Sequence, residues 1–401
     1  MPVKTVVLAD KETGTIKQIG IYPARAKLEN FSRMPCVAVA EFRGNTHLES
    51  TADEVLINGH LISRFNNNTT VFTSSSGTAL SLSFYRQLGF GDAVICASLG
   101  RRVKQQWPNS YITFNVAPQW VPVFKSADGL DEVVARTYRE IPVNRYDGSF
   151  MLDGIFDGSN DSREMSRPAV LYRKLGLGDP EPVMAKPWIT VPDQDRQEAR
   201  DWLRDRGVTV GKDKVVGFQL DCTTLLRTYP EDLRNRALLD LVSIPGVKVV
   251  QFGLTTTPAH ATPLAHASAV DAMNLSLTRT AALMACCDVM VAPDSGLLHL
   301  SCALGRPTVA LFGNMPAMMR VGSYTTVHVL QAESCPCARF PCYEEANTQG
   351  WGMSHCLVPG GRGVLCLRQI DPSQVVAKVV DLLGMTDEAV GRERVYVLEV
   401  I

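Results

Sequence analysis

The sequence predicts an α/β protein with two doubly wound domains joined by a linker, and three observations favour this fold class. Short apolar runs alternate with helical patterns from about Ala79 and again from about Val215, as in parallel sheets covered by helices. The length of 401 residues suits two or three domains. Proline and acidic residues cluster from Asp179 to Arg196, which is typical of an interdomain linker.

The composition excludes several other classes of protein. Hydrophobic residues make up 45% and charged residues 20%, which excludes a disordered, collagen-like or coiled-coil chain. The 40 Lys and Arg residues balance 41 Asp and Glu residues, and a net charge of −1 counts against a nucleic-acid partner. No run of 18 apolar residues predicts a transmembrane segment, and the apolar run Val6 to Ala9 is too short for a signal peptide. We therefore expect a cytoplasmic protein, for which peripheral membrane contact stays open.

Residues 1–78 read as a small β-rich N-terminal module. The runs Val3 to Leu8 and Thr15 to Ile21 predict a hairpin, and Val37 to Phe42 predicts a further strand. A second hairpin is indicated by Val55 to Ile57 and His60 to Ile62, because Asn58-Gly59 between them is the strongest short hairpin signal. No motif in this module points to a chemical role.

Residues 79–185 predict the first Rossmann-like domain. Ala79 to Tyr85 reads as a strand, and a helix is expected from Asp92 to the stop at Trp107-Pro108. Tyr111 to Val116 is the next strand, which completes a βαβ unit with a parallel sheet. The stretch from Tyr146 to Leu177 shows no clear pattern.

Residues 186–385 predict the second domain of this type, and residues 386–401 read as a tail. Four buried strands are expected and helical patterns separate them; the strands are Val215 to Leu220, Val247 to Phe252, Asp288 to Ala292 and Thr308 to Phe312, and the helices include Pro230 to Val242 and Ser276 to Cys286. Ligands of two such domains bind at the carboxyl ends of the strands and in the cleft between the domains.

The segment Asp288 to Gly313 carries the clearest chemical signal. A turn of Pro293, Asp294, Ser295 and Gly296 leads from a strand into a helix that begins at the carboxyl edge of the sheet. Asp294 or Ser295 would cap that helix, and Gly296 would let a ligand approach its N–H groups closely. Such a helix end favours an anion, most often a diphosphate, to which His299 could add a donor. The alternative is that these polar residues only cap the helix and that His299 is a half-buried structural histidine.

Three segments together resemble glycosyltransferase family 9, which contains the bacterial heptosyltransferases of lipopolysaccharide core synthesis. They are the Asp-Ser-Gly turn with His299 and the following Gly-x-Pro strand, the loop Leu88 to Val94, and Thr223-Thr224 followed by Arg227 to Pro230. The resemblance covers about residues 79–383, and the three segments occur in the family's order. It implies the GT-B fold, in which two Rossmann-like domains face a cleft.

The resemblance also implies roles for single residues. Asp92, in a loop with Gly89 and Gly91, matches the catalytic general base, although Asp at a helix start is also a common N-cap. The residues that match the donor and phosphate site are Thr223, Thr224, Arg227, Asp294, Ser295, Gly296 and His299.

The reaction implied is an inverting, metal-independent sugar transfer. A nucleotide-diphosphate sugar would be the donor, with an ADP-sugar as one option, and a glycan or glycolipid hydroxyl would be the acceptor. Residues 79–185 would then be the acceptor domain and 186–385 the donor domain. Two alternatives remain open: a non-catalytic nucleotide-sugar-binding module, or the same chemistry on an acceptor outside lipopolysaccharide.

The chain departs from the family pattern after the run Val247 to Phe252. Relatives often carry a glutamate there that can hold the donor ribose, whereas this chain reads Gly253 to Thr257 and its next acid is Asp271. The nucleotide is therefore left open.

A cysteine-rich segment spans residues 335–366. It holds five of the 11 cysteines, with His355 among them; the five are Cys335, Cys337, Cys342, Cys356 and Cys366. Thiolates this dense suggest a structural zinc site in a reduced compartment, and the alternative is free thiols or an occasional disulfide.

Overall fold

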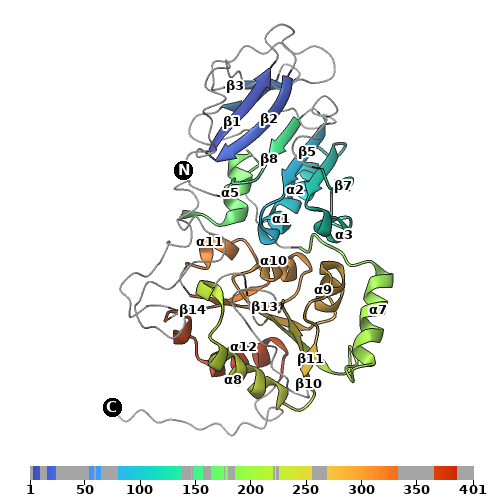
Figure 1. Cartoon of the computed structure of the whole chain (residues 1–401), viewed down its shortest axis with the longest axis vertical. Coiled ribbons are helices and arrows are strands. Elements are labelled where there is room, and N and C mark those ends of the chain that lie inside the picture. Colours follow the sequence, from blue (N-terminus) through green and yellow to red (C-terminus); the bar gives the residue numbers. More distant parts are fainter. Residues whose placement is uncertain are drawn as a thin grey trace. The chain divides into compact units, whose positions relative to one another are not determined.

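The protein is described here from a computed structural model, which shows two compact units (Figure 1). One unit comprises Met1–Thr190 and Met318–Thr325, and the other comprises Val191–Ala317 and Thr326–Ile401. The structure describes residues 3–9, 16–23, 54–57, 60–64, 80–136, 146, 148–156, 164–175, 177–178, 186–219, 222, 225–254, 269–313, 315–332 and 365–385.

The N-terminal residues form the two hairpins that the sequence predicts. Strand β1 (Val3–Ala9) pairs antiparallel with β2 (Ile16–Pro23), and β3 (Glu54–Ile57) pairs antiparallel with β4 (His60–Arg64). The strand expected at Val37 to Phe42 lies outside the described residues.

The first unit contains a parallel sheet of four strands in the order β7-β6-β5-β8. Its strands are β5 (Ser81–Arg86), β6 (Tyr111–Val116), β7 (Glu132–Val134) and β8 (Gly148–Met151). The chain moves outward from β5 through β6 to β7 and then returns to the other side of β5. The strand order therefore reverses between β5 and β8, which is where ligands of doubly wound sheets bind.

The helix expected from Asp92 is in fact two helices, α1 (Phe90–Ala97) and α2 (Leu99–Gln106). Ser98 interrupts them because its hydroxyl donates to the Ile95 carbonyl over 2.6 Å, in competition with the helical pattern. The stretch without a clear pattern contains β8 and α5 (Arg167–Lys174), whose N-cap Ser166 also hydrogen-bonds Ser323 over 2.5 Å. The short helices η2 (Pro118–Trp120), α3 (Val121–Phe124) and α11 (Met318–Val321) complete this unit.

The second unit contains a parallel sheet of six strands in the order β11-β10-β9-β12-β13-β14. Its strands are β9 (Lys214–Gln219), β10 (Val247–Phe252), β11 (Ala269–Asp271), β12 (Val289–Pro293), β13 (Thr308–Phe312) and β14 (Val327–Gln331). Numbered along the unit, this is the order 3-2-1-4-5-6 of dinucleotide-binding domains, and it reverses between β9 and β12. The four predicted strands are confirmed, and the short outer strands β11 and β14 are additional.

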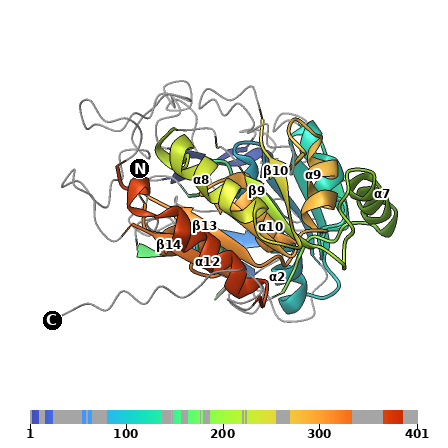
Figure 2. The same cartoon turned by 90° about the horizontal axis from the view of Figure 1, so that it is seen from below.

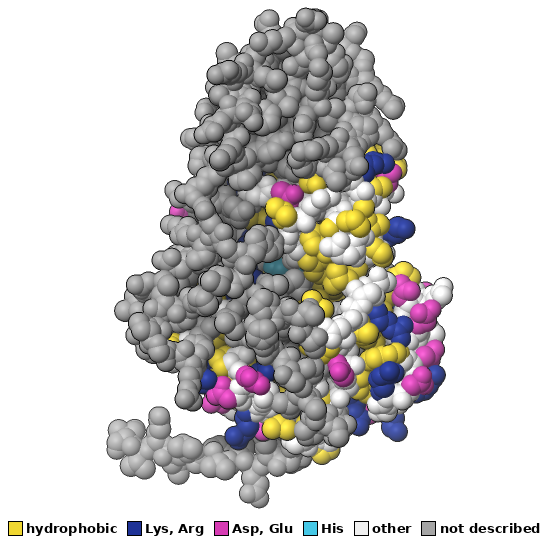
Figure 3. Space-filling model, viewed as in Figure 1, with side chains coloured by type: hydrophobic (Ala, Val, Ile, Leu, Met, Phe, Trp, Pro, Cys, Tyr) yellow, Lys and Arg dark blue, Asp and Glu magenta, His cyan; other side chains and the backbone are white. Residues whose placement is uncertain are grey.

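Helices cover both faces of this sheet (Figures 1 and 2). Helices α8 (Glu231–Val242) and α12 (Pro372–Leu382) lie side by side on one face. Helix α9 (Leu277–Met284) connects β11 to β12, and α10 (Gly296–Ala303) connects β12 to β13; right-handed crossovers place both on the opposite face. Helix α7 (Asp193–Arg204) packs on α9. Acidic and basic side chains are interspersed over α7 (Figure 3), as the balanced net charge leads one to expect. Among the described helices, none is long and apolar enough to cross a membrane.

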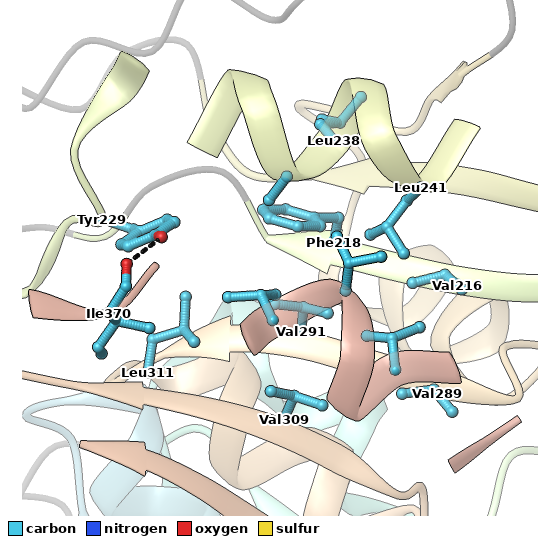
Figure 4. Close-up of a cluster of buried hydrophobic side chains, with 14 of the residues drawn as sticks. Val216, Phe218, Tyr229, Leu238, Leu241, Val289, Val291, Val309, Leu311 and Ile370 are labelled. Atoms are coloured by element: carbon cyan, nitrogen blue, oxygen red, sulfur yellow. Dashed lines mark hydrogen bonds between the residues drawn. The ribbon is translucent and has the colours of Figure 1, made fainter. Parts of the chain in front are cut away.

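Buried apolar side chains pack between the sheet and the helices α8 and α12. Val216 and Phe218 of β9 lie beside Val289 and Val291 of β12, all of them buried (Figure 4). At one side of this cluster, the buried hydroxyl of Tyr229 donates to the carbonyl of Ile370 over 2.6 Å (Figure 4). This bond ties the segment before α8 to the segment before α12.

Replacing Tyr229 by Phe should lower the free energy of unfolding by about 1–3 kcal/mol, because the buried Ile370 carbonyl loses its donor. Urea unfolding followed by circular dichroism measures this change. Tyr111→Phe is the control, since that ring is 44% exposed and its loss should change the free energy by less than about 0.5 kcal/mol. Equal effects of the two substitutions would contradict the assignment.

Candidate functional site

A hydrogen-bonded turn lies at the switch point of the second unit. Ser295 is the N-cap of α10, and its hydroxyl accepts the N–H of Leu298 over 3.2 Å. The same hydroxyl donates to the side-chain carbonyl of Gln219, the last residue of β9, over 2.6 Å. Ser295, rather than Asp294, is thus the helix cap, and it joins the two strands between which the strand order reverses.

Arg227 places a positive charge at this turn. It ends the short helix η5 (Leu225–Arg227), and one guanidinium nitrogen donates to the backbone carbonyl of Asp294 over 2.9 Å. The N–H groups of Gly296 and Leu297 in the first turn of α10 have no acceptor within a helix. A guanidinium and a helix N-terminus at one place make a site suited to a doubly charged anion.

The structure places the other predicted donor-site residues as follows. Asp294 and Ser295 are buried at the end of β12, and Gly296 is the first residue of α10. The His299 side chain, one turn further, is buried with 2% of its surface exposed. Thr223 and Thr224 lie outside the described residues.

Asp92 lies at the switch point of the first unit, between two arginines. One carboxylate oxygen accepts a hydrogen bond from Arg86 over 2.6 Å, and the other accepts one from Arg167. Arg86 is the last residue of β5, and Arg167 is the first residue of α5. The guanidinium groups of both arginines also pack on the ring of Phe156, at 5.6 and 5.4 Å from its centre.

The contacts of Asp92 differ from those of a helix cap. Helix α1 begins at Phe90 with Gly89 as its N-cap, and in the described part of the chain no side chain caps it by a hydrogen bond. Gly89 has a φ of +73°, and a Cβ there would lie 3.2 Å from a carboxylate oxygen of Asp92. A glycine at this position therefore gives the loop its left-handed turn and leaves room for the carboxylate.

A second carboxylate, Asp153, lies close to Arg86. The closest atoms of this ion pair are 3.5 Å apart, and the same oxygen of Asp153 accepts the N–H groups of Gln87 and Leu88 over 3.0 and 2.9 Å. Burial raises the pKa of the Asp153 carboxyl, while Arg86 and the two backbone N–H groups act to lower it.

Sequence reasoning missed four residues of these two sites: Arg86, Asp153, Arg167 and Gln219. Arg86 and Gln219 each end a strand, and Asp153 follows β8 by two residues. A polar residue where an apolar run ends is the signal that could have found Arg86, Asp153 and Gln219, once the order of the strands in the sheet was known. Arg167 begins a helix and carries no such signal.

Four of the five clustered cysteines lie outside the described residues. The fifth, Cys366, is buried, and a Cβ at Gly313 would lie 2.9 Å from its sulfur. The metal site expected in this segment therefore stays a prediction.

Residues 169–346 match the family model of glycosyltransferase family 9 (heptosyltransferase). Among curated protein sequences, none matches this chain significantly.

Solved structures of glycosyltransferases share the fold. A glycosyl transferase family 9 protein of Veillonella parvula is 16% identical, with a TM-score of 0.56 over 77% of this chain and 99% of its own. The ADP-heptose lipopolysaccharide heptosyltransferase II of E. coli is also 16% identical, with a TM-score of 0.54 over 76% of this chain and 98% of its own.

A third structure matches over nearly the whole chain. It is TibC, known from enterotoxigenic E. coli H10407 and described as a dodecameric iron-containing heptosyltransferase in complex with ADP-D-β-D-heptose. It is 13% identical, with a TM-score of 0.57 over 96% of this chain and 92% of its own.

These findings confirm the α/β class and the GT-B fold expected from the three motifs. Residues 169–346 therefore carry a glycosyltransferase domain of the family 9, heptosyltransferase-like type, and the chain shares the fold of solved glycosyltransferases over about three quarters of its length or more.

Proposed function

We propose that the protein is an inverting glycosyltransferase that transfers a sugar from a nucleoside-diphosphate donor to an acceptor hydroxyl without a catalytic metal ion. The observation that carries this proposal is the joint position of Arg227 and the N-terminus of α10 at the switch point of the second unit. Residues of the second unit would bind the donor, and Asp92 of the first unit would act as the general base.

The donor diphosphate would lie against the first turn of α10. Its oxygens would accept the N–H groups of Gly296 and Leu297, and Arg227 would neutralise the charge that develops as the diphosphate leaves. A guanidinium and a helix dipole supply the positive charge that a metal ion supplies elsewhere, which supports metal independence.

The base would work on the acceptor. As the acceptor oxygen bonds to the anomeric carbon, its proton passes to Asp92, and the bond from that carbon to the diphosphate oxygen breaks on the opposite face. Attack opposite the leaving group inverts the anomeric centre. Arg86 and Arg167 each donate a hydrogen bond to one oxygen of this carboxylate and so hold it in place.

An ADP-sugar is the donor that we propose, with a heptose as its sugar. The support is indirect: the E. coli heptosyltransferase II and TibC structures name ADP-heptose in their descriptions. Strand β10 ends at Phe252 and is followed by Gly253 and the exposed Leu254, so no carboxylate directly follows this strand. The next acid in the sequence, Asp271, accepts the N–H of Met273 over 2.8 Å.

A non-catalytic nucleotide-sugar-binding module is the second candidate. It would need the donor site of the second unit and would have no use for a base. The clamped carboxylate of Asp92, which makes no helix cap, favours the enzyme. The acceptor is a glycan or glycolipid hydroxyl in this proposal, inside or outside lipopolysaccharide.

Arg227→Ala should weaken the binding of ADP by about 1.5–3 kcal/mol, because a charge-assisted hydrogen bond to phosphate is lost. Isothermal titration calorimetry measures the affinity, with UDP and GDP in parallel. Arg206→Ala is the matched control, since Arg206 also donates to a backbone carbonyl, that of Trp202, but lies in the exposed turn that follows α7. Unchanged affinity in a folded Arg227→Ala protein would remove Arg227 from the donor site.

Asp92→Asn should lower kcat by roughly 10²- to 10⁴-fold, the usual scale for the loss of a general base, with ADP affinity unchanged. Turnover of donor by the purified protein is the measurement. Asp128→Asn is the control, because Asp128 accepts a hydrogen bond from Arg101 in the same unit but lies outside the site. Near-normal turnover by the Asp92 variant would favour the binding module.

A further inference from the structure

Four charged side chains meet at the switch point of the first unit, and the proposed function assigns a role to only one of them. Arg86 comes from β5, Asp92 from α1, Asp153 from the segment after β8, and Arg167 from α5. All four also act on the buried thiol of Cys96 in α1, whose pKa burial raises far above its ordinary value. Two carboxylates and two guanidiniums make a charge-balanced cluster.

Arg86 is fixed from three sides. One terminal nitrogen donates to Asp92 over 2.6 Å, the other donates to the Leu152 carbonyl over 2.6 Å, and the Nε lies 3.5 Å from Asp153. Its side chain is only 5% exposed. Two hydrogen bonds and an ion pair to three different partners restrict the rotation of this planar guanidinium, and so they restrict the position of the Asp92 oxygen that it holds.

Asp153 holds both the arginine and the loop that leads to the base. Its Oδ1 accepts the N–H groups of Gln87 and Leu88, the two residues before Gly89, while it faces the Nε of Arg86. One carboxylate therefore fixes the backbone from which α1 starts and the side chain that orients Asp92. Arg167, with 24% of its side chain exposed, is held less firmly.

We propose that Asp153 is a positioning residue for the reaction, which acts on Asp92 through Arg86 and through the loop of Gln87 and Leu88. This inference rests on the proposed role of Asp92 as the base.

The charge of Asp153 also acts on Asp92 directly. Among the described residues, the charged and titratable groups around Asp92 include Arg86 from β5, Arg167 from α5, Asp153 after β8, and Cys96 within α1. The two carboxylates repel each other, since the charge of Asp92 acts to raise the pKa of Asp153. Removing the negative charge of Asp153 therefore leaves the positive charge of Arg86 less balanced, and Asp92 becomes a weaker proton acceptor.

Asp153→Asn tests this inference, because the amide keeps the shape and an oxygen for the two backbone N–H groups but carries no charge. We expect kcat to fall roughly 10- to 100-fold, the scale usual for residues that orient a directly acting group, with KM for the donor unchanged. The acid limb of the kcat profile should move to lower pH. Asp131→Asn is the matched control, since Asp131 likewise accepts a backbone N–H, that of Ile112, and pairs with a cation, Lys104, on the far end of the same sheet.

The double variant Asp92→Asn/Asp153→Asn separates a positioning role from a merely structural one. If Asp153 acts through Asp92, the second substitution should change kcat by less than about twofold once Asp92 is gone. An independent loss in the double variant, or an unchanged kcat and acid limb in folded Asp153→Asn, would overturn the inference. The role of Asp92 is judged separately, since its failure would show in the single Asp92→Asn protein.

Discussion

In both units the order of the strands reverses at one place, between β5 and β8 in the first unit and between β9 and β12 in the second. The connections on the two sides of this point leave in opposite directions, so the carboxyl ends of two neighbouring strands stay uncovered. Polar side chains at those strand ends then have no helix over them and must find partners in each other or in a ligand. Both candidate sites are built from such residues.

The two switch points differ in their electrostatics. In the second unit, Ser295 and Gln219 bind each other as neutral groups, and the positive charge of Arg227 and the dipole of α10 act at the same turn. In the first unit, charges of both signs engage one another around Asp92. This contrast fits a division of labour in which the second unit binds a charged donor and the first unit handles a proton.

Much of this arrangement follows from local sequence. Apolar runs bounded by turn residues predicted β9, β10, β12 and β13, since buried parallel strands leave a strong local signal. The cap of α10 followed from the Asp-Ser-Gly turn. The strand β8 escaped prediction because it has only four residues. Helix α5 escaped because its apolar residues are few and stand between Arg167 at its start and Arg173 and Lys174 at its end.

The contacts between Arg86, Asp153 and Asp92 could not be predicted in the same way. They join residues up to 67 positions apart, and they depend on β8 returning to the side of β5 rather than extending the sheet beyond β7. The packing of the whole unit determines which of these two positions β8 takes. The split of the helix at Ser98 likewise depends on a side chain that bonds to its own backbone.

Hydrogen–deuterium exchange tests the central claim most directly, namely that the donor diphosphate binds at the switch point of the second unit. The ligand would be whichever of ADP, UDP and GDP raises the melting temperature most. We expect slower exchange at the N–H groups of Gly296 and Leu297, with no change at those from Gly89 to Asp92. Unchanged exchange at Gly296 and Leu297 with the nucleotide bound would contradict this account, and so would protection that is confined to Gly89 to Asp92.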